Sequence, residues 1–226
     1  NSDSNLGGIG YFEVTSPIPG SELNSGLILA TGGVETLTEL PVCPDPPFPD
    51  AIYDEEEDLF SQLLLIGMEN NLCGVITVEF DFTPISDTVS FEYIFTSAEY
   101  DSWACSVYND IFGFFLSGPG INGSFQNNAV NIALVPDPNN PGQYTNTPVT
   151  ASTITGGVGT MGDESTCAGI DPNWQEYSVF YNSNSTENGF TNIIDIEMDG
   201  FTDPLIATHS VVPCETYHIK LAISNV

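Results

Sequence analysis

Apolar and polar residues alternate through the middle and the end of the chain. Over residues 78–82 the apolar side chains fall on one face and the acidic side chains on the other, which is the period of a half-buried β-strand. A Thr-Pro-Ile-Ser-Asp segment follows, and the alternation resumes over 89–95. We therefore predict an antiparallel hairpin with one buried aromatic face from these two segments.

Similar patterns predict more strands along the chain. Clusters of Gly, Pro, Asn and Asp separate them, as expected of turns. Their spacing indicates an all-β fold, an antiparallel two-sheet β-sandwich of the jelly-roll kind with an aromatic core. The further strand candidates are residues 111–116, 130–135, 177–181, 193–198, 205–212 and 216–223.

One short helix is predicted near residues 55–68. An acidic first turn precedes an apolar run there, and negative charge at a helix N-terminus is favourable. The acidic run at 50–58 is then interpreted as the solvated start of this helix, with a metal site as the alternative. No fixed-period repeat and no long linker marks a boundary, so we expect a single domain over residues 1–226.

Acidic residues set the electrostatics of the chain. Its 226 residues include 31 Asp or Glu and a single Lys or Arg, Lys220, giving a formal charge of -30 at pH 7. Binding to nucleic acid or to an anionic membrane surface needs many cationic side chains, so both are excluded. The hydrophobic share of 41% excludes a disordered acidic tail. The longest aliphatic run, 63–66, is too short to span a bilayer, so no direct membrane insertion is expected.

The cysteines favour disulfides and an extracellular location. All five lie far apart without a CxxC pair, which disfavours a zinc site. Their spacing does not fix the pairing, and we expect Cys105 to pair with Cys167 because both lie in predicted loops. Asn-x-Ser/Thr sites at Asn122 and Asn184 suit a secreted protein.

One loop between two predicted strands gathers hard oxygen donors. Glu99, Asp101, Asn109 and Asp110 lie on it, and Ca²⁺ takes about six to eight oxygen ligands with tolerant geometry. These four residues are therefore the predicted ligands of a calcium site. The alternative is that Asn109 and Asp110 cap a turn while Glu99 faces water.

Two aromatic residues of the same loop suggest a second kind of binding. Tyr100 and Trp103 are candidates for stacking on a sugar ring, with core packing as the alternative. The alternating acids Asp195, Glu197 and Asp199 are expected to face solvent.

Catalytic signals are weak. No nucleophile motif surrounds a Ser or Cys, and His209 and His218 lie in predicted strands, where a structural role is expected. A glycosidase mechanism with two catalytic carboxylates stays open, because it depends on the distance between them in space, which the sequence does not give.

The segments 96–119, 131–136, 199–202 and 212–223 resemble the choice-of-anchor L domain family of secreted bacterial surface modules, and 25–32 and 78–93 also match. The resemblance implies an extracellular, adhesive or structural β domain whose partners are neighbouring copies, other surface proteins or glycans. It implies no reaction. The family usually shows two acids before the loop tyrosine, where this chain has Ala98 and Glu99.

Family members commonly continue past the final strand, whereas this sequence stops at Val226. A missing last strand would open a sheet edge to a neighbouring chain, although truncation is the favoured explanation. We therefore expect a non-enzymatic, calcium-stabilised surface protein. The alternatives are a filament or lattice subunit joined by strand exchange and a glycan-active hydrolase.

Overall fold

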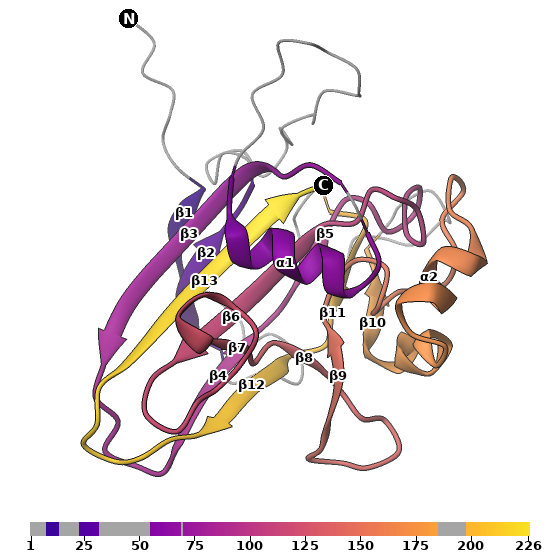
Figure 1. Cartoon of the computed structure of the whole chain (residues 1–226). Coiled ribbons are helices and arrows are strands. Elements are labelled where there is room, and N and C mark those ends of the chain that lie inside the picture. The colour runs from indigo at the N-terminus through magenta and orange to yellow at the C-terminus, as the bar shows by residue number, and fades with distance from the viewer. Residues whose placement is uncertain (1–7, 14–22, 32–54, 69, 185–197) are drawn as a thin grey trace, which may run out of the picture.

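The computed structural model describes residues 8–13, 23–31, 55–68, 70–184 and 198–226 (Figure 1). The described part is mostly β, and every strand pair in it is antiparallel. This confirms the β-rich, antiparallel class. The two-sheet jelly-roll sandwich is not confirmed, because the described strands form one four-stranded, one three-stranded and three two-stranded sheets.

The largest sheet has four strands, and helix α1 (Glu57–Leu65) contacts two of them, β6 and β13 (Figure 1). Burial along β6 is complete, as expected of a central strand covered on both faces. The strand order is β3 (Cys73–Phe82), β13 (Tyr217–Asn225), β6 (Ile111–Ser117) and β7 (Val130–Asn131).

The predicted hairpin is wrong. Its first half is β3, which pairs with β13, and its second half is β4 (Thr88–Tyr93), which pairs with β12 (Leu205–Ser210). Alternation identifies a strand and its buried face, but the partner is chosen by packing between distant segments. Consecutive strands therefore diverge here into two sheets.

Short strand pairs complete the β structure. Of the predicted 130–135 strand, one end is β7 and the other lies in a separate sheet. Residues 193–197 of another candidate lie outside the described residues. The remaining sheets are β1 (Ile9–Glu13) with β2 (Ser25–Leu29), β10 (Tyr181–Ser183) with β11 (Gly200–Thr202) and β5 (Thr96–Ser97), and β8 (Leu134–Pro136) with β9 (Tyr144–Pro148).

Helix α1 lies where the sequence predicts a helix, but three helical segments were missed: η1 (Gln126–Asn128), α2 (Glu164–Ile170) and η2 (Trp174–Phe180). The strand predicted at 177–181 is mostly η2. Trp174 and Tyr177 are both buried and three residues apart, which places them on one side of a helix with about three residues per turn. The burial of two residues at helical spacing therefore favours a helix here over the strand that the short aromatic run predicted.

Aromatic rings fill the space between β4 and β6, as predicted. Tyr93 meets Phe112 and Phe114 at centroid distances of 5.3 and 5.1 Å, and Phe95 stacks on Phe112 at 5.0 Å. Edge-on and offset rings at these distances are favourable beyond the area they bury.

Candidate functional site: a buried carboxyl pair beside an apolar cavity

The acidic loop connects β5 to β6 and brings two carboxyl groups together. Ser97 ends β5, and its hydroxyl donates a 2.7 Å hydrogen bond to Asp110 Oδ2. The Glu99 backbone N–H donates to the same hydroxyl at 3.0 Å, and the Asp110 backbone N–H donates to the Glu99 carboxylate. Glu99 and Asp110 thus share one network at the ends of two strands, as the sequence predicts.

This pair carries buried negative charge without full compensation. In the described structure, Glu99 Oε2 and Asp110 Oδ1 are buried and have no hydrogen-bond partner. Burial and then repulsion from Asp110 raise the pKa of Glu99 to about 9. Burial raises the pKa of Asp110 to about 6, against the lowering effect of the Ser97 hydroxyl. The pair therefore holds about one proton near neutral pH.

The loop that carries the pair is fixed by its neighbour, the segment 150–167. A disulfide joins Cys105 to Cys167 with Cα atoms 4.9 Å apart, in agreement with the expected pairing. Ser152 Oγ accepts from the Cys105 N–H at 2.9 Å. Gly159 packs so closely that a Cβ there would lie 2.6 Å from the Ser102 carbonyl carbon. The carboxyl pair thus sits on a rigid support.

Two of the four predicted calcium ligands do not join the pair. Asn109 is fully buried, and its Oδ1 accepts from the Ser152 N–H at 2.9 Å, so its amide braces the loop from inside. Among the described residues no three His, Cys, Asp or Glu side chains gather at one point, so Asp101 does not complete a cluster with Glu99 and Asp110. The predicted four-residue site is therefore wrong, and the two-carboxylate part of it forms.

The aromatic residues of the loop pack against protein. Tyr100 is 3% exposed, and its ring lies 4.9 Å from that of Tyr181, so the prediction that Tyr100 stacks on a sugar is wrong. Trp103 is partly exposed and contacts Tyr108 edge-on at 5.0 Å.

Two tyrosines outside the loop are also affected by burial. Tyr177 and Tyr181 both have pKa values raised to about 12, mainly by burial.

The two Asn-x-Ser/Thr sites differ. Asn122 is exposed, so its amide is accessible. Asn184 is 2% exposed, and its Nδ2 donates to the Met198 carbonyl at 2.9 Å. The Asn184 amide is therefore not accessible for glycosylation in the folded chain, and the sequon there gives no support for secretion.

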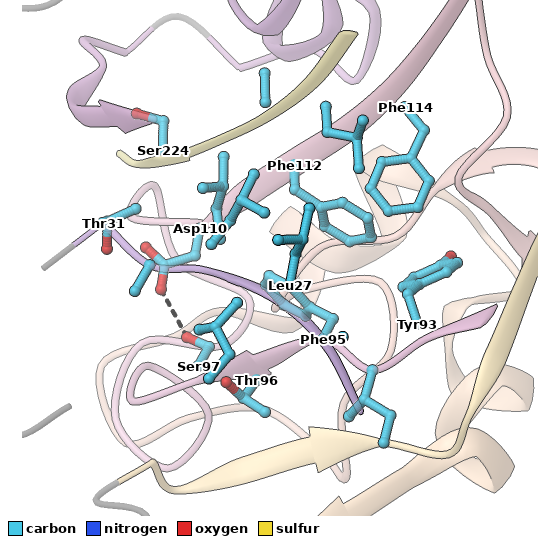
Figure 2. Close-up of a pocket in the computed structure, with 18 of the residues that line it drawn as sticks. Leu27, Thr31, Tyr93, Phe95, Thr96, Ser97, Asp110, Phe112, Phe114 and Ser224 are labelled. Carbon is cyan, nitrogen blue, oxygen red and sulfur yellow. Dashed lines mark hydrogen bonds between the residues drawn. The ribbon is translucent and has the colours of Figure 1, made fainter. Parts of the chain in front are cut away.

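An apolar cavity of about 500 Å³ adjoins the carboxyl pair (Figure 2). Aromatic and aliphatic side chains form most of its wall, and Ser97 and Asp110 lie at one end. Tyr93 lies at the other end, with a buried hydroxyl that has no partner in the described structure. The labelled apolar residues of the wall are Leu27, Phe95, Phe112 and Phe114.

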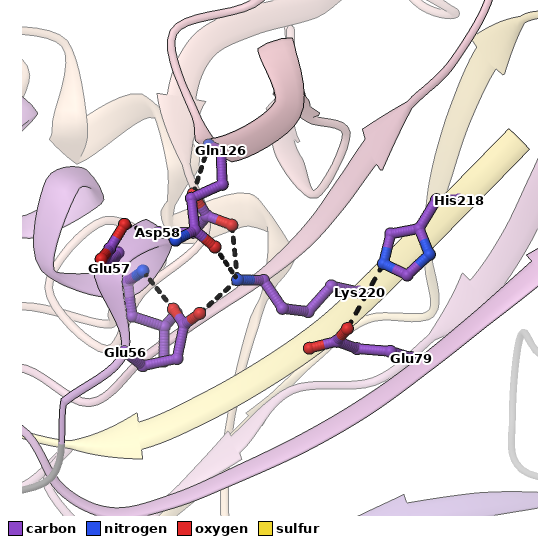
Figure 3. A network of polar contacts seen from close by, with 8 residues as sticks. Glu56, Glu57, Asp58, Glu79, Gln126, His218 and Lys220 are labelled. Carbon is purple, nitrogen blue, oxygen red and sulfur yellow. Dashed lines mark hydrogen bonds and ion pairs between the residues drawn. The ribbon is translucent and has the colours of Figure 1, made fainter.

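A second buried acidic site was missed by sequence reasoning. Lys220 on β13 pairs with Glu56 and with Asp58 of α1, and these three side chains are 2–9% exposed (Figure 3). Glu56 also caps the helix by accepting from the Leu59 N–H at 2.7 Å. The interpretation of this acidic run as solvated is therefore wrong for Glu56 and Asp58. The available signal in the sequence was Lys220 itself, because a single lysine among 31 acidic residues is expected to pair with some of them.

Comparison with known proteins gives a family. The chain matches the family described as Choice-of-anchor L domain over residues 1–226, its whole length. The comparisons with curated proteins and with solved structures gave no match. No helix in the described ranges is long and apolar enough to cross a membrane. The chain therefore belongs to the choice-of-anchor L domain family, which is one of bacterial cell-surface or secreted proteins.

Proposed function

We propose that this chain is a non-enzymatic module of the bacterial cell surface, adhesive or structural, that forms a single domain over residues 1–226 and is stabilised by Ca²⁺ at Glu99 and Asp110. Family membership supports the location. The observation that supports the cation is the carboxyl pair, in which each side chain has one buried oxygen without a hydrogen-bond partner among the described residues.

Charge balance favours a bound cation. The chain has one Lys or Arg in total, and that residue, Lys220, is engaged by Glu56 and Asp58. The Glu99–Asp110 pair therefore depends on a proton or on a cation from outside the protein. A divalent cation would replace the shared proton and lower the pKa of both carboxyl groups.

The chemistry of the donors points to Ca²⁺ among divalent cations. Carboxylate and hydroxyl oxygens are hard ligands, which Ca²⁺ prefers, and Zn²⁺ sites usually include His or Cys. Ser97 Oγ lies within the same network. Backbone carbonyls and water would supply the other ligands, as is common for Ca²⁺.

Thermal unfolding of the whole chain tests this proposal. Protein freed of metal with EDTA is titrated with CaCl₂ at pH 7, with NaCl at matched ionic strength as the control. We expect saturable stabilisation of about 2.7 kcal/mol at one hundred times the dissociation constant, which raises Tm by roughly 5–10 °C for a domain of this size.

Matched variants locate the effect. Glu99→Gln should lose the response to Ca²⁺. Glu215→Gln should keep it, because this substitution removes the same charge from an exposed position outside the proposed site. A wild-type Tm that Ca²⁺ leaves unchanged, or an equal rise in Glu99→Gln, contradicts the calcium proposal.

The glycan-hydrolase alternative has less support. The cavity beside the carboxyl pair is mostly apolar, whereas a sugar needs many hydrogen-bonding partners. Release of reducing ends from a polysaccharide by the wild-type protein, lost in Glu99→Gln, would favour a hydrolase and contradict a non-enzymatic role.

Strand exchange needs an open sheet edge, and β12 offers one of those in the described structure. Strand β12 pairs with β4 on one side, and no described strand pairs with its other side. Light scattering over a range of protein concentrations would detect assembly. A Thr208→Pro variant, which removes a backbone donor from β12, would show whether that edge carries it.

A further inference from the structure

A second pocket lies on another part of the molecule. It has a volume of about 610 Å³, within the range typical of ligand sites. Its wall runs from the last turn of α1 and the loop 123–125 across β7, β8 and β9 to β12. The pocket is open to solvent, because Ser124 and Asn146 in its wall are exposed.

The described wall carries no carboxylate and its one basic side chain is His209, in a protein of net charge -30. None of the described residues that line the pocket is Asp, Glu, Lys or Arg, although the chain has 31 acidic residues. The field of the whole protein repels an anionic ligand. The same field attracts a cation, but the described wall offers a cation no carboxylate with which to pair. An uncharged ligand meets neither obstacle.

The polar groups in the wall suit a ligand with many hydroxyls. Asn146, Ser124 and Tyr144 line the pocket, and no hydrogen bond to the Asn146 side-chain amide or to the hydroxyls of Ser124 and Tyr144 is found in the described structure. An amide offers both a donor and an acceptor, as does a hydroxyl. Phe125 and Tyr144, both partly exposed, add ring surface for the apolar face of a sugar.

The floor of the pocket is rigid. Asn131 Nδ2 donates to Gln62 Oε1 at 2.7 Å, and Gln62 Nε2 donates to the Phe112 carbonyl at 2.9 Å. Asn131 Oδ1 accepts from the Phe114 N–H at 3.0 Å. Because these buried amides are held by the core, a ligand would bind a preformed surface and lose less free energy to ordering it.

From these observations we infer that the pocket between α1, β9 and β12 binds an uncharged saccharide, with Asn146 and Tyr144 as the residues that recognise it. The inference extends the surface role proposed above by naming a ligand class and a site. It uses neither Glu99 nor Asp110, so the calcium proposal and this one stand or fall separately.

Titration with defined oligosaccharides tests the inference. The full chain is titrated by calorimetry with maltohexaose, cellohexaose, laminarihexaose and chitohexaose, and with hexagalacturonate as an acidic comparison, in Ca²⁺ and in EDTA. We expect at least one neutral oligosaccharide to bind saturably with a dissociation constant below about 10 mM. This dissociation constant should be the same in EDTA where the protein stays folded. The acidic oligosaccharide should not bind.

Two small substitutions assign the binding to the pocket. Asn146→Ala and Tyr144→Phe should each weaken binding roughly two- to tenfold, the effect of losing one hydrogen bond. Asn173→Ala is the control, because Asn173 is exposed and lies outside the pocket wall. Both pocket variants should keep the wild-type Tm and its response to Ca²⁺.

The inference is overturned if no neutral oligosaccharide of the panel binds, if the acidic one binds more tightly, or if Asn146→Ala and Tyr144→Phe bind as the wild type does. Loss of the Ca²⁺ response in Glu99→Gln with saccharide binding retained would show that the two sites are independent. Loss of saccharide binding in Asn146→Ala with the Ca²⁺ response retained would also show that the two sites are independent.

Discussion

Two pairs of buried acids in the described part of the chain are balanced in different ways. Glu56 and Asp58 bind the ammonium group of Lys220 (Figure 3), whereas Glu99 and Asp110 each have one buried oxygen without a hydrogen-bond partner in the described structure. The difference follows from composition, because a chain with one Lys or Arg can neutralise one such site internally. The other site is left to protons or to ions from the surroundings.

The two sites also hold different parts together. The Lys220 site joins α1 to the four-stranded sheet, and the ammonium also lies 5.6 Å from the centre of the Phe115 ring. The Glu99–Asp110 site holds a loop that a disulfide already fixes. Stability should therefore depend on the first site under all conditions and on the second in a manner set by pH and calcium.

The largest effect is expected from Lys220→Met. Two carboxylates would be left buried without a cation, and breaking a buried ion pair on one side costs about 3–5 kcal/mol. Urea unfolding would measure the loss. Adding Glu56→Gln and Asp58→Asn to Lys220→Met should recover much of it, and a loss below about 1 kcal/mol in the single variant contradicts a structural role for the ion pairs.

Removal of the loop disulfide is expected to cost nearly as much. The bonded residues are 62 positions apart, and closing a loop of that length contributes about 4 kcal/mol in the chain-entropy account. Urea unfolding of the double variant Cys105→Ala and Cys167→Ala measures this. Cys214→Ala is the control, since that thiol is exposed and free. An equal loss of unfolding free energy in Cys214→Ala would contradict a stabilising role for the Cys105–Cys167 disulfide.

The carboxyl pair predicts a falling stability with rising pH. Both pKa values are raised by folding, to about 9 for Glu99 and about 6 for Asp110, so the folded state holds protons that the unfolded state releases. The free energy of unfolding of metal-free protein should fall by up to about 1.4 kcal/mol per pH unit from pH 6 towards 9. Urea titrations at several pH values measure it.

Two conditions should flatten this slope. Glu99→Gln removes the proton that the pair shares, and saturating Ca²⁺ replaces it. The same steep slope in Glu99→Gln would show that groups other than this pair cause it.

The smallest effect is expected from His218→Gln. This residue lies on the same strand as Lys220, but its contacts with Asp81 and with Glu79 are exposed, and Figure 3 shows the contact with Glu79. Exposed ion pairs contribute less than about 1 kcal/mol and weaken in salt. Urea unfolding at pH 6 in low and high salt should show a small difference that salt removes. A loss as large as that of Lys220→Met would erase the contrast between buried and exposed pairs.

Local patterns predicted what local forces decide. The β-rich class, the helix near residues 55–68 and the loop that carries Glu99 and Asp110 follow from periodicity and turn residues. The pairing of β3 with β13 and of β4 with β12 joins strands more than 100 residues apart, and no local signal records it.

The candidate site was predicted in part for the same reason. The order of strand, loop and strand placed Glu99 beside Asp110, but the direction of each loop side chain depends on the segment packed against it. Asn109 turns inward because the Ser152 N–H is there to be satisfied, and Tyr100 turns inward towards Tyr181. The partners of Glu56 and Asp58 likewise come from the far end of the chain.

The buried position of the lone basic residue also bears on proteolysis. Enzymes that cut after Lys or Arg have one target in this sequence, at Lys220, and it lies 6% exposed in the middle of a paired strand. Trypsin should therefore leave the folded protein intact and cleave it as soon as β13 separates from its neighbours. For a protein that works outside the cell, one residue thus supplies both an internal counter-ion and protection from a common class of digestive enzymes.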